Sequence, residues 1–306
     1  MNTPTNAAPA PFGLTVGPVP YYWTRATLQA FYAGLADSAA DTIVLGETTC
    51  ARRHEMKPAD WIALGTELRA SGKDVWFATQ TLIESDADLR VVQRFVDETG
   101  FGLEAGDASA LQLCLQAGRP FALGPHVNVY SRAALDEYRR LGARRWIAPV
   151  ELPLESVARI ADPALPTEVF AFGRLPLAFS ARCFTARHHR LAKDRCEFRC
   201  ADDGDGLLLA TTEGEPFLVL NGTQVQSAGQ HCLIGHRVAL HAAGVTRLRL
   251  SPVSARFAEV VDHFDAVMNR GASADAARIA LDAMSLPGGL VDGYAYGRAG
   301  LDWIPA

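Results

Sequence analysis

The sequence predicts an α/β fold, a (β/α)8 TIM-like barrel with a small cysteine-bearing β insertion near its last strands. Two observations predict the barrel. Short apolar segments alternate with helical segments seven times before residue 180, and a further apolar strand follows at residues 247–250. Such alternation is typical of parallel βα units, and eight of these units close into a barrel. The insertion is predicted because the alternation stops between residues 181 and 244.

Each element is justified by its local pattern. The expected strands are short apolar runs at residues 14–19, 42–46, 74–79, 101–104, 121–123, 146–148, 168–172 and 247–250. The expected helices have helical spacing of apolar residues and lie at residues 23–36, 60–70, 86–99, 108–117, 132–141, 153–160 and 255–268. Thr24 is the expected cap of the first helix, and Gly72 and Gly100 end the second and third.

The insertion has the pattern of β-hairpins. Its segment GLLLATTEGEPFLVLNGT contains Glu213-Gly214 and Asn221-Gly222, which are good turn dipeptides. We therefore expect one barrel domain over residues 12–306 that includes a β-rich insertion at about 181–246. Residues 1–11 are small, polar or proline and are predicted to be disordered.

Composition excludes several function classes. The chain has 306 residues and a formal net charge of −5, so no overall positive field favours nucleic acid as a partner. It contains no run of about 18 apolar residues, which a membrane span would need. The N-terminal segment lacks the apolar stretch of a signal peptide. We therefore expect a cytoplasmic protein, whose cysteines remain reduced and favour metal or redox roles.

Four of the six cysteines form the most informative pattern. Cys183, Cys196 and Cys200 are spaced C-x12-C-x3-C, and Cys50 follows an early strand. Cys50 and Cys183 each come just after a strand-like segment, and strand ends form the functional face of a barrel. Cys196 and Cys200 are four residues apart, so one short helix would present both thiols on one face. The four thiols are therefore expected to meet at one end of the barrel and bind a metal.

The spacing leaves the kind of metal centre open. Structural zinc usually takes paired short spacings such as C-x2-C, whereas an iron–sulfur cluster accepts longer and less regular spacing. Geometry thus mildly favours a cluster over zinc. The alternative is that the cysteines are ordinary core residues, which fits Cys114 and Cys232. It fits Cys196 and Cys200 poorly, because their surroundings, KDRCEFRC, are charged.

A group of basic residues surrounds the C-x12-C-x3-C pattern. They are Arg182, Arg187, Arg190, Lys193, Arg195 and Arg199. Cations near a cluster with four thiolate ligands would offset its negative charge. The alternatives are a local RNA-binding patch or a solvated surface without a role, which is the usual explanation of a charge run.

Other motifs carry less weight. Asn128 and Tyr130 follow a strand in the segment GPHVNVY, and they either line a pocket or cap the next helix. His188 and His189 are adjacent and are expected to be exposed. The sequence has no H-E-x-x-H, G-x-G-x-x-G or Walker A motif, so neither a zincin nor a nucleotide-binding protein is indicated.

Five segments together resemble the collagenase-like peptidase family of unassigned catalytic type. They are LGETTCARRHEMKPADW (45–61), SGKDVWFATQTLIES (71–85), PFALGPHVNVYS (120–131), FAFGRLPLAFSARCF (170–184) and the C-x12-C-x3-C pattern. The resemblance covers nearly the whole chain after about residue 12. It implies that Cys50, Cys183, Cys196 and Cys200 bind a 4Fe-4S cluster.

The resemblance also implies a function and a partner. It implies a heterodimer with a longer relative and oxygen-independent hydroxylation of the ring of ubiquinone precursors, with prephenate as hydroxyl donor. An RNA-base hydroxylation factor and a non-catalytic scaffold held together by its metal are the alternatives. Peptidase activity is not expected, because the cysteines left over, Cys114 and Cys232, have no evident base beside them. The sequence identifies no catalytic residue.

Overall fold

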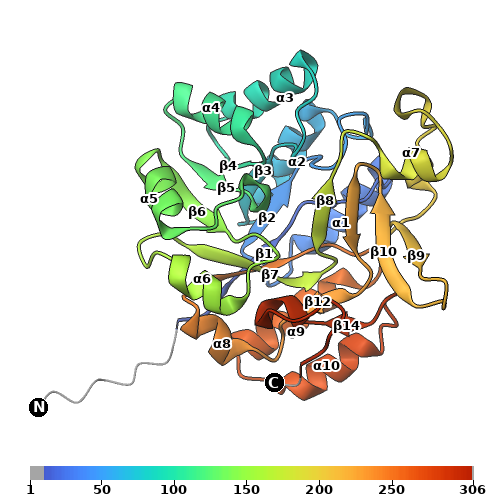
Figure 1. The fold of residues 1–306 in the computed structure, drawn as a ribbon. Coiled ribbons are helices and arrows are strands. Elements are labelled where there is room, and N and C mark those ends of the chain that lie inside the picture. The colour runs from blue at the N-terminus through green and yellow to red at the C-terminus, as the bar shows by residue number, and fades with distance from the viewer. Residues whose placement is uncertain (1–9, 305–306) are drawn as a thin grey trace, which may run out of the picture.

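The computed structural model describes residues 10–304, and it is a closed barrel of parallel strands (Figure 1). Each barrel strand pairs in parallel with the next, and β13 closes the ring by pairing with both β1 and β7. The strands are β1 (Gly13–Val16), β2 (Thr42–Leu45), β3 (Asp74–Ala78), β4 (Gly102–Ala105), β5 (Phe121–Leu123), β6 (Ala143–Ile147), β7 (Thr167–Gly173) and β13 (Arg247–Leu250). The predicted (β/α)8 barrel is confirmed.

Helices follow the strands and cover the outside of the barrel (Figure 1). The α-helices that alternate with barrel strands are α1 (Arg25–Leu35), α2 (Pro58–Ala70), α3 (Asp86–Asp97), α4 (Ala108–Gln116), α5 (Arg132–Arg140), α6 (Leu154–Ile160), α8 (Arg237–Ala242) and α9 (Phe257–Met268). Thr24 caps α1 as predicted, because its side chain accepts a hydrogen bond from the Thr27 amide. An additional helix, α10 (Ala274–Asp282), was not predicted.

The small β unit is a separate antiparallel sheet with the order β8–β11–β10–β9. Its strands are β8 (Pro176–Phe179), β9 (Leu207–Ala210), β10 (Pro216–Asn221) and β11 (Gln224–Ser227). The two predicted turns are present, with Gly214 and Gly222 at positive φ. The sheet begins earlier than residue 181, because β8 leaves the end of β7 and pairs with β11.

Three further pieces complete the chain. β12 (Gln230–Cys232) pairs antiparallel with β7, and β14 (Leu290–Val291) pairs with β12. The cysteine-rich segment contains α7 (Phe184–His188) and the short 3-10 helices η2 (Lys193–Arg195) and η3 (Arg199–Ala201). Two other 3-10 helices are η1 (Pro125–Val127) and η4 (Gly293–Tyr296). The predicted disorder at the N-terminus falls largely on residues 1–9, which lie outside the described residues, and Ala10 and Pro11 are exposed coil.

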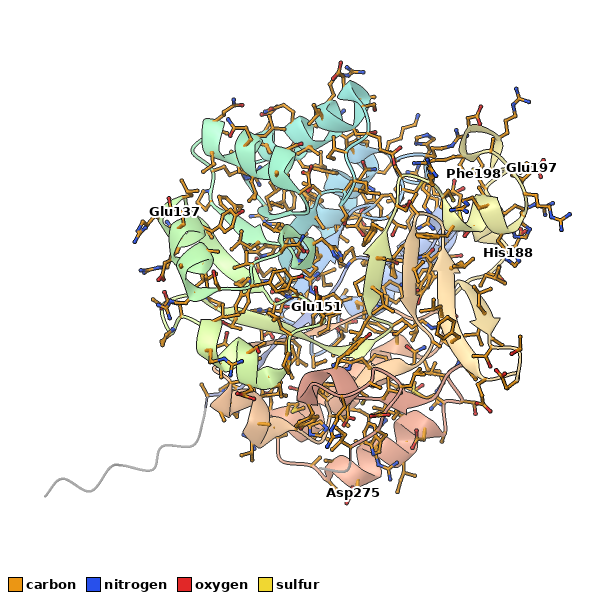
Figure 2. The ribbon with its side chains drawn as sticks, in the orientation of Figure 1. Glu137, Glu151, His188, Glu197, Phe198 and Asp275 are labelled. Carbon is orange, nitrogen blue, oxygen red and sulfur yellow. The ribbon has the colours of Figure 1, made fainter. Side chains whose placement is uncertain are left out.

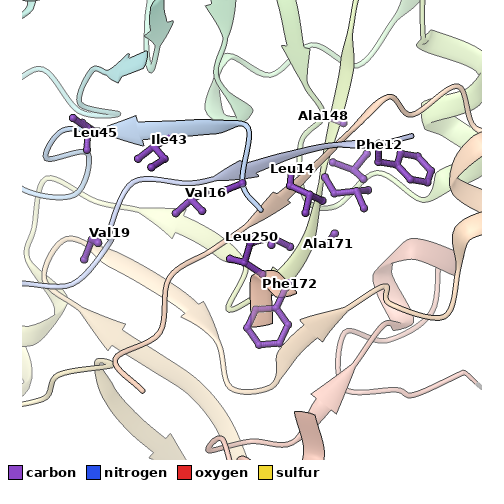
Figure 3. Packing of buried hydrophobic residues seen from close by; sticks show 14 of the residues in the cluster. Phe12, Leu14, Val16, Val19, Ile43, Leu45, Ala148, Ala171, Phe172 and Leu250 are labelled. Atoms are coloured by element: carbon purple, nitrogen blue, oxygen red, sulfur yellow. The ribbon is translucent and has the colours of Figure 1, made fainter. Parts of the chain in front are cut away.

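The main core lies between the strands and the surrounding helices (Figure 3). Alternate residues of a strand point to opposite faces, so Leu14 and Val16 face the helices while Thr15 between them faces the barrel interior. β13 shows the same alternation, because Leu248 and Leu250 are fully buried in the main core. The remaining residues of that strand are arginines, which the barrel interior must accommodate.

Candidate functional site

The four predicted cysteines lie around one cavity. This cavity, which we call the cysteine cavity, has a volume of about 340 Å³ and is lined by Cys50, Cys183, Cys196 and Cys200. Cys183 and Cys196 are buried, the other two are partly exposed, and all four are free thiols. Figure 2 shows the neighbouring residues Glu197, Phe198 and His188 at the edge of the molecule, on the lobe that carries α7.

Cys183 occupies the N-cap of α7, directly above the β10–β11 turn. Its Sγ accepts a hydrogen bond from the Ala186 amide at 3.4 Å. The Gly222 carbonyl accepts a hydrogen bond from the Phe184 amide at 2.8 Å, and the Gly222 amide donates to Thr185 Oγ1 at 2.9 Å. Gly222 has φ +64°, a left-handed conformation that favours glycine. The Asn-Gly turn therefore fixes the position of the Cys183 thiol.

The helix expected to present Cys196 and Cys200 together is absent, so that prediction was wrong. Cys196 follows η2, Cys200 lies within η3, and between them Glu197 and Phe198 have φ of 51° and 53°. Two consecutive left-handed residues interrupt a right-handed helix. Cys196 and Cys200 still line the same cavity, because the chain reverses direction between them.

The loop after β2 positions Cys50. The Glu47 side chain accepts hydrogen bonds from the Thr49 amide at 2.8 Å and from the Cys50 amide at 3.0 Å. Thr49 is tied to the small sheet, because its carbonyl accepts a hydrogen bond from the Thr223 hydroxyl. Burial raises the pKa of Glu47, and the nearby Arg53 guanidinium, at 3.6 Å, opposes that rise.

Arg53 is the functional residue that the sequence interpretation missed. It is 4% exposed and donates to the Pro20 carbonyl at 2.6 Å and to Asn221 Oδ1 at 2.7 Å. It also lines the cysteine cavity and lies beside Cys200. The sequence contains one signal for Arg53, its position three residues after Cys50 in a charged segment. It does not indicate which residues the Arg53 side chain contacts.

Burial favours the protonated form of the Cys50 and Cys200 thiols when no metal is bound. Burial raises the pKa of Cys50 to about 11, and Glu47 adds to this rise. Burial also raises the pKa of Cys200, although Arg53 opposes the rise. A metal that binds here has to displace these protons, as metals bound by thiolates do.

Most of the basic residues singled out in the sequence do not line this cavity. Arg182, Arg187, Arg190 and Arg195 are exposed, which matches the solvated-surface alternative. Lys193 and Arg199 do line the cavity, and Lys193 also forms an ion pair with Glu84, with Nζ 2.6 Å from Oε2. The cations nearest to the thiols thus include Arg52 and Arg53, outside the C-x12-C-x3-C segment.

The four free thiols form an all-sulfur donor set, which suits either an iron–sulfur cluster or zinc. Within residues 10–304, no three His, Cys, Asp or Glu side chains converge tightly enough to hold a single metal ion. The four thiols instead surround a space. A single zinc requires sulfur atoms about 2.3 Å from one point, whereas an iron–sulfur cluster is held by cysteines around a wider core.

A second cavity, the barrel-mouth cavity, lies between the carboxyl ends of the barrel strands and the small sheet. Its volume is about 530 Å³, and it shares no lining residue with the cysteine cavity. Its polar lining comes from the barrel and from the sheet: Glu104, His126, Arg174, Gln224, Gln226 and Arg249. Active sites of this fold form at this end of the barrel.

A buried ion network forms the floor of the barrel-mouth cavity. Arg249 Nε donates to Glu168 at 2.6 Å, and its Nη1 donates to Glu104 at 3.1 Å. Arg145 and Arg247 approach the same Glu168 carboxylate at 3.4 and 3.6 Å. Burial raises the pKa of Glu168, but these arginines outweigh burial and hold it below its usual value.

The segment after β5 contributes different residues from those expected. Asn128 and Tyr130 are exposed and do not line the cavity, and Ser131, not either of them, caps α5. Pro125 and His126 line it instead. The backbone turns away after His126 because Asn128 adopts a left-handed conformation with φ 60°.

The remaining cysteines are core residues, as predicted. Cys114 and Cys232 are fully buried, and burial raises the pKa of the first to about 11 and of the second to about 12.

Among the described residues, no helix has both the length and the apolar character required to cross a membrane.

Comparison with protein families identifies the family of the chain. The model of peptidase family U32 matches residues 27–300. Among solved structures, the chain is similar to phospho-2-dehydro-3-deoxyheptonate aldolase from Thermotoga maritima, with 12% identity, a TM-score of 0.42 and coverage of 90% of this chain and 70% of that one. It is also similar to the spore cortex-lytic enzyme SleL of Bacillus megaterium, with 10% identity, a TM-score of 0.41 and coverage of 84% and 75%. The match of the family model over most of the chain shows that this protein belongs to peptidase family U32.

Proposed function

We propose that the chain is a UbiV-type member of its family, the 4Fe-4S subunit of an oxygen-independent hydroxylase. In this proposal it forms a heterodimer with a longer UbiU-like relative in the cytoplasm. The pair hydroxylates the ring of ubiquinone precursors, with prephenate as hydroxyl donor. One observation carries the proposal: four free thiols from separate segments of the chain line a single cavity.

The chemistry of the cavity supports a cluster. Cys50, Cys183, Cys196 and Cys200 would supply the four thiolates, and the bound cluster would supply one-electron chemistry. Arg53 lies beside Cys200 and Lys193 lines the wall, so positive charge is present where four thiolates would carry negative charge. Phe198 and Ala186 add apolar surface that limits the access of water.

The surrounding residues have assignable roles. The Glu47 carboxylate orients the amide of Cys50, and the Gly222 turn orients α7. Arg53 joins the two parts, because it contacts the loop after β2 and also the β10–β11 hairpin. These contacts fix the segments that carry Cys50 and Cys183, as the partners of metal ligands do.

The decisive experiment is anaerobic purification with iron and sulfide analysis and EPR of the reduced protein. We expect about four iron and four sulfide per chain, as a 4Fe-4S centre requires. Cys196→Ala should lose the bound iron, whereas Cys114→Ala, a buried cysteine outside the cavity, should retain it. Stoichiometric zinc without iron, or equal iron in both variants, would overturn the proposal.

Co-purification with a tagged longer relative tests the partner. We expect a one-to-one complex with ring-hydroxylating activity that depends on prephenate. A folded Cys196→Ala complex with full activity would point to the scaffold alternative instead. RNA affinity with a steep salt dependence would point to RNA modification.

A further inference from the structure

The barrel-mouth cavity has the wall of a small-molecule site, with apolar rings and a few polar side chains. Phe170 comes from the barrel, Phe179 from the small sheet, and three prolines add to the apolar wall: Pro18, Pro20 and Pro176. Two phenyl rings and three proline rings in the wall favour a ring-bearing ligand.

Arg174 gives the cavity an unpaired positive charge. This side chain is 2% exposed and has no carboxylate within ion-pair distance among the described residues. Its guanidinium donates to the carbonyls of Asp205, Ala228 and Pro287, which do not neutralise it. The other arginine that lines the cavity, Arg249, is already paired with two carboxylates. A buried cation of this kind favours an anionic ligand.

Gln226 gives the same cavity an unsatisfied acceptor. The side chain is 1% exposed, and its Oε1 has no hydrogen-bond partner within the described part of the chain. Leaving a buried acceptor unpaired is unfavourable. A hydroxyl on the ligand would satisfy this oxygen when the amide turns it toward the cavity.

The cation and the acceptor lie close together in the wall of the cavity. Gln226 pairs in register with Pro176, two residues after Arg174, and Arg174 Nε donates to the carbonyl of Ala228, two residues after Gln226. A ligand that meets both must therefore carry its carboxylate and its hydroxyl close together. A 2-hydroxycarboxylate has this arrangement.

We propose that the barrel-mouth cavity binds a 2-hydroxycarboxylate that carries an apolar ring. Its carboxylate faces Arg174, its hydroxyl donates to Gln226 Oε1, and its ring packs against Phe170 and Phe179. The site is separate from the cysteine cavity, because the two cavities share no lining residue. Binding can therefore be measured whatever the iron content of the protein.

Calorimetric titration of the full-length protein tests this site with three probes. They are 3-phenyllactate, 3-phenylpropionate, which lacks the hydroxyl, and 3-phenyl-1,2-propanediol, which lacks the charge. We expect 3-phenyllactate to bind at least about tenfold more tightly than either analogue, since each lost interaction is worth about 1.4 kcal/mol or more. Equal affinities, or no saturable binding of 3-phenyllactate, would overturn the proposal.

A matched pair of variants assigns the effect to Gln226. Gln226→Leu should remove the preference for the hydroxyl. Gln230→Leu should keep it, because Gln230 is equally buried with an equally unpaired Oε1 but lies outside the cavity. Preference for the hydroxyl in a folded Gln226→Leu variant would refute the assignment.

His126 provides a readout that does not need a variant. Burial, aided by Arg249, lowers its pKa to about 4, and its ring meets the Phe179 ring at 4.7 Å. An anion in the cavity should raise this pKa, which NMR titration of the imidazole measures in the unmodified protein. An unchanged pKa at saturating 3-phenyllactate would show that the anion binds elsewhere.

Discussion

Replacing Arg53 with Met tests whether this buried arginine joins the loop after β2 to the small sheet. Its guanidinium donates to the Pro20 carbonyl at 2.6 Å and to Asn221 at 2.7 Å, and it lies 3.6 Å from Glu47. Methionine retains much of the volume but removes every donor and the charge. The variant therefore leaves the Pro20 carbonyl and the Glu47 carboxylate with fewer partners.

The expected loss of stability follows from these contacts. A hydrogen bond from a charged donor contributes about 1.5–3 kcal/mol, and breaking one side of a buried ion pair costs about 3–5 kcal/mol. These values are not additive, because one guanidinium makes all the contacts. We therefore expect Arg53→Met to lower the free energy of unfolding by about 3–5 kcal/mol.

Urea unfolding of the metal-free protein, followed by tryptophan fluorescence, measures this loss. The matched control is Arg52→Met, which removes the same charge from the adjacent position. Arg52 has no ion pair among the described residues, and its contact with the Phe198 ring, at 5.8 Å, contributes about 1 kcal/mol or less. Equal unfolding free energies for the two variants would refute the role assigned to Arg53.

Three other changes have defined outcomes. Arg249→Leu leaves its two buried carboxylate partners uncompensated and should cost about 3–5 kcal/mol in urea unfolding. Gly222→Ala should cost more than Gly214→Ala in the same assay, because both have positive φ but only the first places a Cβ 2.9 Å from a buried arginine. The pKa of His126 falls from 6.5 to about 4 on folding, so the unfolded state binds a proton that the folded state excludes. Stability should therefore fall as the pH drops from 6.5 to 4, by at most about 3 kcal/mol for this group, and His126→Gln should flatten that part of the pH profile.

The barrel was predictable from sequence because the local pattern of each segment agrees with its place in the barrel. Phe121–Leu123 and Arg247–Leu250 have the predicted bounds, and each of the other barrel strands overlaps its predicted segment. Parallel strands buried on both faces read as short apolar runs between turn residues. α10 was missed, although Ser273 caps it by accepting a hydrogen bond from the Ala276 amide.

The ion network inside the barrel was not predictable in the same way. Arg249, Glu104 and Glu168 belong to three strands that are far apart in the chain. Their charges stabilise the fold only because barrel closure brings them within hydrogen-bond distance. A single sequence shows that a charged residue lies in a strand, but it does not show which opposite charge it meets.

The candidate site was also predictable only in part. Spacing and position after strands predicted that four cysteines meet, and the structure brings them to one cavity. The helix expected between Cys196 and Cys200 was wrong because left-handed Glu197 and Phe198 carry no glycine signal. Arg53 was missed because its partners, Pro20 and Asn221, are remote in sequence.

The β10–β11 hairpin explains why both cavities occur at one end of this barrel. Asn221 donates to the Pro20 carbonyl at 2.8 Å and to Gln224 at 3.1 Å, and both of these residues line the barrel-mouth cavity. Asn221 also accepts from Arg53, which lines the cysteine cavity. The two cavities thus share one hydrogen-bonded wall, built by a single turn of the small sheet. Because a buried polar wall loses stability when any member is removed, a substitution at Asn221 should disturb ligand binding in both cavities, whereas Gln226 and Cys196 should each affect only their own.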